Sequence, residues 1–262
     1  MVTGAVLHTH TYGAEAAAPA VVALHGIRGH GARWRSLTEQ HLPGIRVHGL
    51  DLRGHGRSTW SPPWTLEQHA ADVLTTMDEL GLGRADVIGH SFGGAVALYV
   101  ARYAPDRVRR LVLLDPAIGL PTTVASDGAR DNLVRQSFDD QGQARVAQAV
   151  HWPDSVGQPA VDTEVEEHLE QGEDGRWRWR FEPATVVTAY SEMARPHVVP
   201  PPGLPTLLVR AAVDPVVPAG FIAACRAARG ADVTVTDVDC GHLVYLERPA
   251  ETAALTRKFL DR

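Results

Sequence analysis

A serine stands between two glycines in residues 89–93, whose sequence is GHSFG. The segment follows the apolar run 85–88 and precedes residues 95–103, where apolar side chains keep helical spacing. A sharp strand-to-helix turn at such a place exposes the hydroxyl, and it brings the two backbones so close together that glycine is needed on both sides. An ordinary glycine-rich turn is the alternative interpretation, and the flanking patterns count against it. Ser91 is therefore a candidate nucleophile.

A serine nucleophile requires a base, because its hydroxyl is almost wholly protonated at neutral pH. His242 follows the predicted strand 233–238, which places it at the carboxyl edge of the sheet, where catalytic groups collect. His25 follows an earlier buried run, and we interpret it as a histidine that packs and hydrogen-bonds within its own loop. Among the thirteen histidines, His242 is the candidate base.

A carboxylate must hold that base in the correct tautomer. Asp214 follows the predicted strand 206–209, and Asp115 ends the predicted strand 108–115. The chain order of serine, acid and histidine that is usual for this type of turn favours Asp214 as the acid. Asp115 is the alternative acid, because it also lies at the carboxyl end of a strand.

The negative oxygen of a tetrahedral intermediate requires hydrogen-bond donors as well. The amide of Phe92 directly follows the candidate nucleophile and opens a helix, whose dipole favours negative charge. A second donor is expected from the glycine-containing loop after the strand 21–24, and there the amide of Ile27 is the candidate. Ile27 and Phe92 are therefore predicted to form an oxyanion hole with their backbone N–H groups.

Strand and helix patterns alternate along most of the chain. Short apolar runs predict strands that are covered on both faces, and hence a parallel sheet. Thr65 and Gln68 predict a capping box at the start of one helix. The expected strands are 21–24, 45–50, 85–89, 108–115, 206–209 and 233–238, and the expected helices are 32–42, 65–80, 95–103, 220–229 and 249–260. The pattern is typical of a doubly wound α/β fold.

The alternation is interrupted between residues 117 and 202. Charged helical segments such as 161–170 occur there without strands of the core type, and a proline-rich stretch at 199–202 marks the return to the sheet. We therefore expect an α/β core formed by residues 1–116 and 203–262, with residues 117–202 inserted as a helical cap.

Composition limits the classes of function. The chain has 262 residues, of which 44% are hydrophobic and 21% charged, and its formal net charge is −6, which predicts a soluble globular protein and argues against nucleic acid as the main partner. Two cysteines are too few for a disulfide framework, and Cys240 is interpreted as a small buried hydrophobic residue. The first residues carry neither a basic segment nor an apolar segment of a signal peptide, and no apolar stretch is long enough to span a bilayer. We expect a cytoplasmic location.

Two stretches invite other interpretations. Residues 51–58 (DLRGHGRS) combine glycines with basic residues but lack the spacing of a phosphate-binding loop, so Arg53 and Arg57 are expected to fix the loop by hydrogen bonds. Residues 176–181 (RWRWRF) alternate basic and aromatic side chains, a pattern that can bind single-stranded nucleic acid. Because the chain is acidic, we favour an extended segment whose aromatics pack into the cap and whose arginines face solvent.

Four segments carry a resemblance to a known family. His25-Gly26, residues 51–58, residues 89–94 (GHSFGG) and Gly241-His242 resemble, in this order, the α/β-hydrolase superfamily. The resemblance spans nearly the whole chain, and within the superfamily it is narrowest to small lipases and esterases of the LipV type. It implies an eight-stranded, mostly parallel sheet, a Ser91, Asp214 and His242 triad, and a cap after the strand that ends at Asp115.

Two positions refine what the resemblance implies. The glycine usual before the acid loop is replaced by Ala211-Ala212, which weakens the assignment of Asp214. A serine at position 91 differs from the carboxylate nucleophile of haloalkane dehalogenases and of most epoxide hydrolases with this fold.

The predicted function is hydrolysis of carboxylic esters through an acyl-enzyme intermediate. The expected partner is a small-molecule ester with an apolar acyl or alcohol group, which cap aromatics such as Trp152 and Tyr190 could line. We expect no metal ion, no organic cofactor, no nucleic acid and no stable insertion into a membrane. The same fold also permits a carbon–carbon bond hydrolase, a lyase or a cofactor-free perhydrolase, and a ligand-binding receptor with slow turnover is a further alternative.

Overall fold

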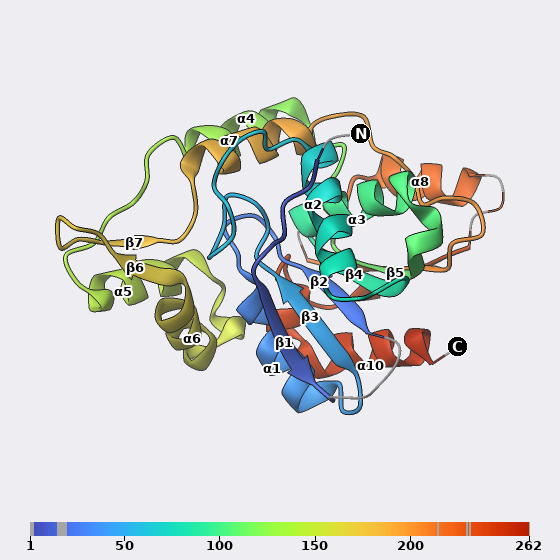
Figure 1. Cartoon of the computed structure of the whole chain (residues 1–262), viewed down its shortest axis with the longest axis horizontal. Coiled ribbons are helices and arrows are strands. Elements are labelled where there is room, and N and C mark those ends of the chain that lie inside the picture. Colours follow the sequence, from blue (N-terminus) through green and yellow to red (C-terminus); the bar gives the residue numbers. More distant parts are fainter. Residues whose placement is uncertain (1–2, 15–19, 214, 229, 231, 262) are drawn as a thin grey trace.

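The computed structural model describes residues 3–14, 20–213, 215–228, 230 and 232–261. Within them, one mixed sheet has the strand order β1-β3-β2-β4-β5-β8-β9, and only β1 runs antiparallel to its neighbour (Figure 1). The strands are β1 (Thr9–Gly13), β2 (Val21–Leu24), β3 (Arg46–Leu50), β4 (Ala85–His90), β5 (Val108–Leu114), β8 (Thr206–Ala211) and β9 (Val233–Val238). The predicted doubly wound α/β fold is confirmed.

Helices cover both faces of this sheet (Figure 1). One face packs against α1 (Trp34–His41) and α10 (Pro249–Leu260), and the other against α2 (Leu66–Glu79), α3 (Phe92–Tyr103) and α8 (Ala219–Ala227). The short helix α9 (Val244–Glu247) leads into α10. Because both faces are covered, the central strands β2 and β4 are buried along their full length, as their apolar runs predict.

The number of strands differs from the eight that the family resemblance implies. Seven strands make up the main sheet in the described part of the chain. The segment before β1 bonds to α2 instead of pairing as a further strand: the amide of Ala5 donates to Asp72 Oδ1 at 2.7 Å, and the amide of Leu7 donates to Thr76 Oγ1 at 2.9 Å. These side chains satisfy backbone groups that a neighbouring strand would otherwise have to satisfy.

Half of the predicted capping box forms at the start of α2. The hydroxyl of Thr65 accepts a hydrogen bond from the amide of Gln68 at 3.2 Å, as predicted. The side chain of Gln68 does not reach back to Thr65; its amide donates to the oxygen of Thr3 at 3.0 Å and to Asp72 Oδ1 at 2.9 Å. Gln68 therefore ties the N-terminal segment to α2.

Residues 117–202, which we call the cap, extend from the hairpin end at the left of Figure 1 across the top of the molecule. They form α4 (Thr122–Arg130), α5 (Gln141–His151), α6 (Gln158–His168), a hairpin of β6 (Leu169–Gln171) and β7 (Trp177–Trp179), and α7 (Pro183–Met193). The hairpin makes a separate two-stranded sheet. The cap is thus mainly helical, and its extended piece falls where the RWRWRF sequence predicts one.

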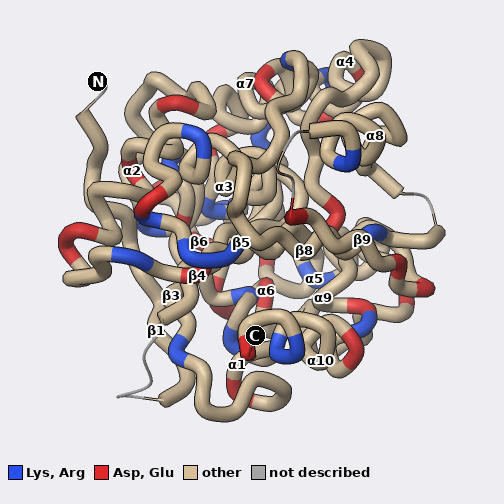
Figure 2. The backbone as a smooth tube through the Cα atoms, turned by 90° about the vertical axis from the view of Figure 1, so that its right-hand side faces the viewer, with Lys and Arg blue, Asp and Glu red and all other residues tan. Residues whose placement is uncertain are grey.

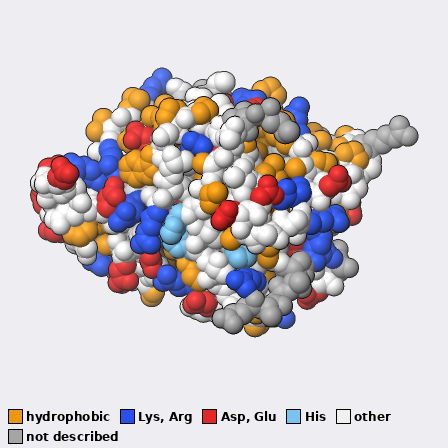
Figure 3. All heavy atoms as spheres, viewed as in Figure 1, with side chains coloured by type: hydrophobic (Ala, Val, Ile, Leu, Met, Phe, Trp, Pro, Cys, Tyr) orange, Lys and Arg blue, Asp and Glu red, His pale blue; other side chains and the backbone are white. Residues whose placement is uncertain are grey.

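The alternating side chains of that hairpin divide between core and surface. Trp179 and Phe181 are buried, whereas Arg178 pairs with Asp174 and Arg180 with Glu170, the latter at 3.1 Å. The hairpin end of the molecule, at the left of Figure 3, accordingly shows basic and acidic side chains next to one another. The burial of Trp179 and Phe181 confirms that these aromatics pack inward, and the ion pairs neutralise Arg178 and Arg180.

The cap is held to the core by buried polar contacts. Glu164 of α6 is 2% exposed, and its carboxylate accepts hydrogen bonds from Arg33 Nε at 2.8 Å and from His30 Nε2 at 3.0 Å. Burial alone would raise the pKa of Glu164, but the charge of Arg33 outweighs this effect and holds the pKa well below its usual range. The carboxylate is therefore ionised and paired, as a buried charge must be.

The loop of residues 51–58 also joins the cap to the core. The guanidinium of Arg53 donates to both carboxylate oxygens of Asp72, at 2.6 and 2.8 Å, which confirms its expected structural role. The amide of Gly56 donates to the oxygen of Arg180 at 2.7 Å, and the amide of Glu182 donates to the oxygen of Gly54 at 2.8 Å. Arg57 contributes through its backbone amide, which donates to Asp51 at 2.9 Å.

Basic and acidic residues are interspersed along the backbone drawn in Figure 2. Arg210 and Asp237, on the adjacent strands β8 and β9, form an ion pair at 2.6 Å.

Cys225 and Cys240 are free and buried, and burial raises the pKa of each thiol to about 11. Among the described residues, no helix combines the length and the apolar character needed to cross a bilayer.

Candidate functional site

Ser91 occupies the turn between β4 and α3 in a strained backbone conformation, with φ of 53° and ψ of −119°. The glycines beside it allow this turn. A Cβ added to Gly93 would lie 2.3 Å from the oxygen of Leu24, and a Cβ added to Gly89 would lie 2.3 Å from the oxygen of Gly93. The sharp strand-to-helix turn that the GHSFG segment predicts is therefore present, and it directs Ser91 away from the strand.

His242 is hydrogen-bonded to a buried carboxylate, that of Asp115. The Nδ1 atom of His242 lies 2.6 Å from Asp115 Oδ2, and Asp115 is fully buried. The same carboxylate accepts hydrogen bonds from the amides of Ala211 at 3.2 Å and Val216 at 3.1 Å. Since a carboxylate can only accept here, Nδ1 of His242 is the donor of this hydrogen bond, which leaves Nε2 as the ring nitrogen that does not contact Asp115.

The structure describes only one of the two candidate acids. Asp115, the alternative acid, directly follows β5, and its amide donates to the oxygen of Val209 on the adjacent strand β8 at 2.7 Å. Asp214, which the chain order favours, lies outside the described residues. Because β5 and β8 are parallel neighbours, an acid after either strand reaches the same edge of the sheet.

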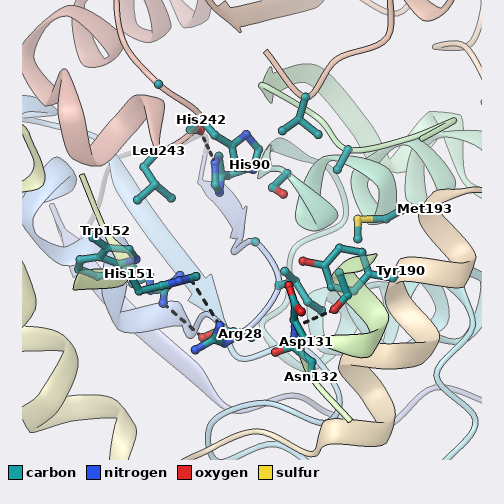
Figure 4. A pocket seen from close by; sticks show the side chains of 18 of the residues that line it. Arg28, His90, Asp131, Asn132, His151, Trp152, Tyr190, Met193, His242 and Leu243 are labelled. Carbon is teal, nitrogen blue, oxygen red and sulfur yellow. Dashed lines mark hydrogen bonds between the residues drawn. The ribbon is translucent and has the colours of Figure 1, made fainter. Parts of the chain in front are cut away.

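The loop that carries His242 is fixed by two residues that the sequence did not single out. His90 Nε2 donates to the backbone oxygen of His242 at 2.8 Å (Figure 4), and burial lowers the pKa of His90 well below its usual value, so its ring is neutral. The carboxylate of Glu247 accepts from the amides of Gly241 and Leu243, both at 3.1 Å. The only sequence signal for His90 is its position directly before Ser91.

The two predicted oxyanion donors lie on adjoining segments. Phe92 is the first residue of α3, and the first amides of a helix have no partner within it. Ile27 lies in a turn that the amide of Gly29 closes onto the oxygen of Gly26 at 3.0 Å. A Cβ added to Gly26 would lie 3.1 Å from Ser91 Cβ, so this turn packs directly against the candidate nucleophile.

His25 has the role in its loop that we expected. Its Nδ1 atom lies 2.7 Å from the oxygen of Gly26, and its Nε2 atom accepts from the amide of Leu52 at 2.9 Å. Both ring nitrogens of His25 are engaged, which leaves the ring to support the turn before Ile27.

A cavity of about 450 Å³ lies between the core and the cap, a size typical of small-molecule sites. Ser91, His242 and Ile27 line it from the core. Trp152 and Tyr190, which the sequence left open as pocket residues, both line it, and Figure 4 shows them on opposite sides of the cavity. Other lining side chains include Arg28, Leu120, Val124, Asp131, Asn132, His151, Met193 and Leu243.

One group of possible metal ligands occurs elsewhere in the described residues. His8, His10 and Asp51 place their ligand atoms within 4.8 Å of one another. The carboxylate of Asp51 already accepts from the amides of Gly31 at 2.7 Å and Arg57 at 2.9 Å, and lies 3.2 Å from His10 Nε2. These bonds fix the 51–58 loop, and none of the three side chains lines the cavity.

His69 of α2 provides a prediction for acid stability. Its ring packs edge-on against Phe92 with centroids 5.1 Å apart, and neither ring nitrogen has a partner in the described structure. Burial lowers the pKa of His69 to about 3 from 6.5. The folded state therefore binds fewer protons than the unfolded state, so stability is complete above pH 6.5 and falls as the pH decreases towards about 3.

Replacing His69 by Leu is expected to flatten this pH dependence. The wild-type histidine contributes a slope of up to about 1.4 kcal/mol per pH unit below its unfolded pKa, and the leucine variant loses this contribution. Urea unfolding of both proteins between pH 7 and pH 4 measures the difference. An equal loss of unfolding free energy in the two proteins would contradict the assignment.

Comparisons with known proteins agree with this architecture. A family model described as the alpha/beta hydrolase fold matches residues 19–249. Lipase LipV of Mycobacterium tuberculosis is 40% identical over 257 residues, which cover 97% of each chain. Two solved structures are similar in fold, a marine microorganism esterase (TM-score 0.79, 21% identity, covering 98% of this chain and 100% of that chain) and E-2-(acetamidomethylene)succinate hydrolase (TM-score 0.84, 23% identity, covering 98% and 95%).

Proposed function

The chain belongs to the alpha/beta hydrolase family, and from this premise we propose that it hydrolyses carboxylic esters through a Ser91, His242 and Asp115 triad. One observation carries the proposal more than any other. Nδ1 of His242 contacts the buried carboxylate of Asp115 at 2.6 Å, while His242 and the strained Ser91 line the same cavity. This arrangement leaves Nε2 of His242 as the free base on the cavity side.

The first half of the proposed reaction forms an acyl-enzyme. Ser91 Oγ attacks the ester carbonyl carbon while Nε2 of His242 takes the hydroxyl proton. Asp115 accepts the hydrogen bond from Nδ1–H and stabilises the imidazolium that results. The tetrahedral intermediate then expels the alcohol, which receives the proton from His242, and Ser91 keeps the acyl group.

The second half of the reaction releases the acid. A water molecule attacks the acyl carbon as Nε2 of His242 takes one of its protons, and that proton returns to Ser91 Oγ when the intermediate collapses. In both halves the amides of Ile27 and Phe92 are assigned as the donors of hydrogen bonds to the negative oxygen of the tetrahedral intermediate. The packing of the Gly26 turn against Ser91 supports this assignment, and each such donor contributes about 10²- to 10³-fold in rate.

The position of His90 supports the same assignment of roles. Its bond to the backbone oxygen of His242, together with the Glu247 clamp on both sides of that residue, restricts the imidazole to one orientation. A base that is held in place loses little freedom when the transition state forms. We assign His90 and Glu247 as positioning residues.

The cap supplies the remaining walls of the proposed substrate site. Residues 117–202 place Leu120, Trp152 and Met193 around the cavity, which favours a small ester with an apolar part. We propose that this insertion on the core of residues 1–116 and 203–262 selects the substrate, and that the reaction requires no cofactor.

A panel of substrates tests the reaction class. Esters with acyl chains of graded length are assayed beside a diketone, for carbon–carbon bond cleavage, and beside a peroxide assay for perhydrolysis. We expect multiple turnovers with short and medium esters and no turnover of the diketone. Inertness towards every ester, or turnover of the diketone alone, would reject ester hydrolysis in favour of another reaction on the same fold.

A further inference from the structure

Arg28 places a guanidinium group in the wall of the cavity. Its NH1 atom lies 3.4 Å from His151 Nε2, and its Cζ atom lies 5.4 Å from the ring centroid of Phe181. In the part of the chain that the structure describes, no carboxylate forms an ion pair with Arg28. A half-buried cation with only an imidazole and an aromatic face as partners retains unused N–H donors.

No acidic group of the described residues forms an ion pair with Arg28, although Tyr190 and the charge of Glu164 partly offset the effect of burial on its pKa. Glu164 is occupied by Arg33 and His30, and Asp131, which also lines the cavity, is exposed and forms no ion pair with Arg28. Burial lowers the pKa of His151 to about 4, so this ring is neutral at pH 7. Burial likewise lowers the pKa of Arg28, and the nearby charge of Arg33 lowers it further.

The backbone of Arg28 is strained in the same way as the backbones of two candidate catalytic residues. Its φ is 60°, in the left-handed region that bulky residues rarely adopt. Among the described residues other than glycine, only Arg28, Ser91 and Asp115 have positive φ. Strain of this kind persists where the surrounding structure holds a residue for a function, and it costs about 1–3 kcal/mol at each position.

Figure 4 shows where the guanidinium lies relative to the candidate base. His242 and His90 stand at one end of the cavity, and Arg28 lies at the other, between His151 and Asp131. Arg28 directly follows Ile27, the proposed oxyanion donor, so one short turn would hold both the carbonyl oxygen and a second group of the substrate.

We propose that Arg28 binds a carboxylate carried by the substrate, so that the preferred esters have an acidic group separated by a short apolar spacer from the scissile carbonyl. The planar guanidinium matches a carboxylate with two parallel hydrogen bonds. A single unpaired arginine suits a singly charged carboxylate better than a doubly charged phosphate. The apolar walls accommodate the spacer. This inference rests on the proposed ester hydrolysis.

Pairs of substrates that have nearly the same shape but differ in charge test the proposal. Monomethyl adipate, whose acidic group lies on the acyl side of the ester, is compared with its neutral carboxamide analogue. 4-Acetoxybutanoate, whose acidic group lies on the alcohol side, is compared with 4-acetoxybutanamide. We expect the wild type to prefer the acidic member of at least one pair. In Arg28→Gln, kcat/KM for that acidic ester should fall by about 10- to 100-fold, as expected for a hydrogen bond to a charged group, while the neutral ester changes by less than about twofold.

Two further variants separate specific recognition from general electrostatics. Arg28→Lys keeps the charge but loses the planar fork, so it should recover only part of the preference. Arg130→Gln removes the same charge from an exposed side chain that pairs with Asp127 at 3.0 Å and directly precedes the cavity-lining Asp131, and it should behave as wild type. An equal loss in Arg28→Gln and Arg130→Gln, or equal losses for the acidic and neutral esters, would overturn the proposal.

A binding measurement keeps this inference distinct from the proposed reaction. Calorimetric titration of adipate into Ser91→Ala measures carboxylate binding without any turnover, and Arg28→Gln in the same background should bind adipate at least about tenfold more weakly. Absence of binding, or binding that is unaffected by Arg28→Gln, would refute the carboxylate site. Ester turnover that shows no acidic preference would leave the proposed hydrolysis intact and refute this inference alone.

Discussion

Replacing Ser91 by Ala is expected to lower kcat for ester hydrolysis by up to about 10⁶-fold, because no acyl-enzyme can form without the hydroxyl. The residual rate would come from the oxyanion donors and from substrate binding, neither of which the substitution removes. Steady-state turnover of a p-nitrophenyl ester by wild type and variant measures the loss.

The Ser91→Ala variant should keep its fold. Alanine tolerates the strained turn no better than serine, but the glycines at positions 89 and 93 and the bond from the amide of residue 91 to the oxygen of Leu114 are retained. Circular dichroism and thermal unfolding check this point. A folded variant that retains wild-type ester turnover would show that another residue is the nucleophile.

Replacing Asp115 by Asn is expected to lower kcat by about 10⁴-fold, since an amide at this position favours the wrong tautomer of the base. The buried carboxylate holds Nδ1 of His242 at 2.6 Å and also accepts from two backbone amides, so the substitution affects both orientation and charge. The value of kcat for Asp115→Asn is measured with the p-nitrophenyl ester used for Ser91→Ala, under the same conditions.

The matched control for this prediction is Asp214→Asn, which changes the acid that the chain order favours. If Asp115 holds the base, Asp214→Asn should cost far less than Asp115→Asn. Unfolding free energies of both variants are needed, because an asparagine at the buried position 115 also loses one of the two oxygens that accept from the amides of Ala211 and Val216. A larger loss of kcat in Asp214→Asn would return the role of the acid to Asp214.

Residues with a strong local signal could be predicted from the sequence. Ser91 is recognised because a strand pattern, two glycines and a helix pattern all require the same turn, and His242 because it follows the last strand. The six expected strands and five expected helices follow from apolar periodicity, which reflects burial on one face or on both, whereas β1 was not predicted. Arg53 was also recognised as a loop anchor, and it binds Asp72.

Other features depend on contacts that sequence patterns do not encode. Asp115 and Asp214 follow neighbouring parallel strands, so both satisfy the same rule, and the choice depends on where each side chain points. The described residues form seven strands of the main sheet instead of eight, and here too contacts decide, because side chains of α2 satisfy the amides of residues 5 and 7. Arg28 faces the cavity through a backbone conformation that its sequence neighbours do not indicate.

The residues of the cap show the same limit. The sequence allowed the aromatic side chains at positions 152 and 190 to line a pocket but did not decide it, and the structure places both in the cavity wall. Their separation across the cavity depends on how α7 packs against α4 and how α5 packs against α6, since side chains distant in sequence must meet.

Trapping the acyl-enzyme tests the central claim most directly. Wild type is mixed with p-nitrophenyl acetate, quenched in acid during turnover and digested, and the peptides are analysed by mass spectrometry. We predict an acetyl group on Ser91 in the wild type and no acetylated peptide in Ser91→Ala. Turnover without any adduct on Ser91, or an acetyl group on a different side chain, would contradict the triad.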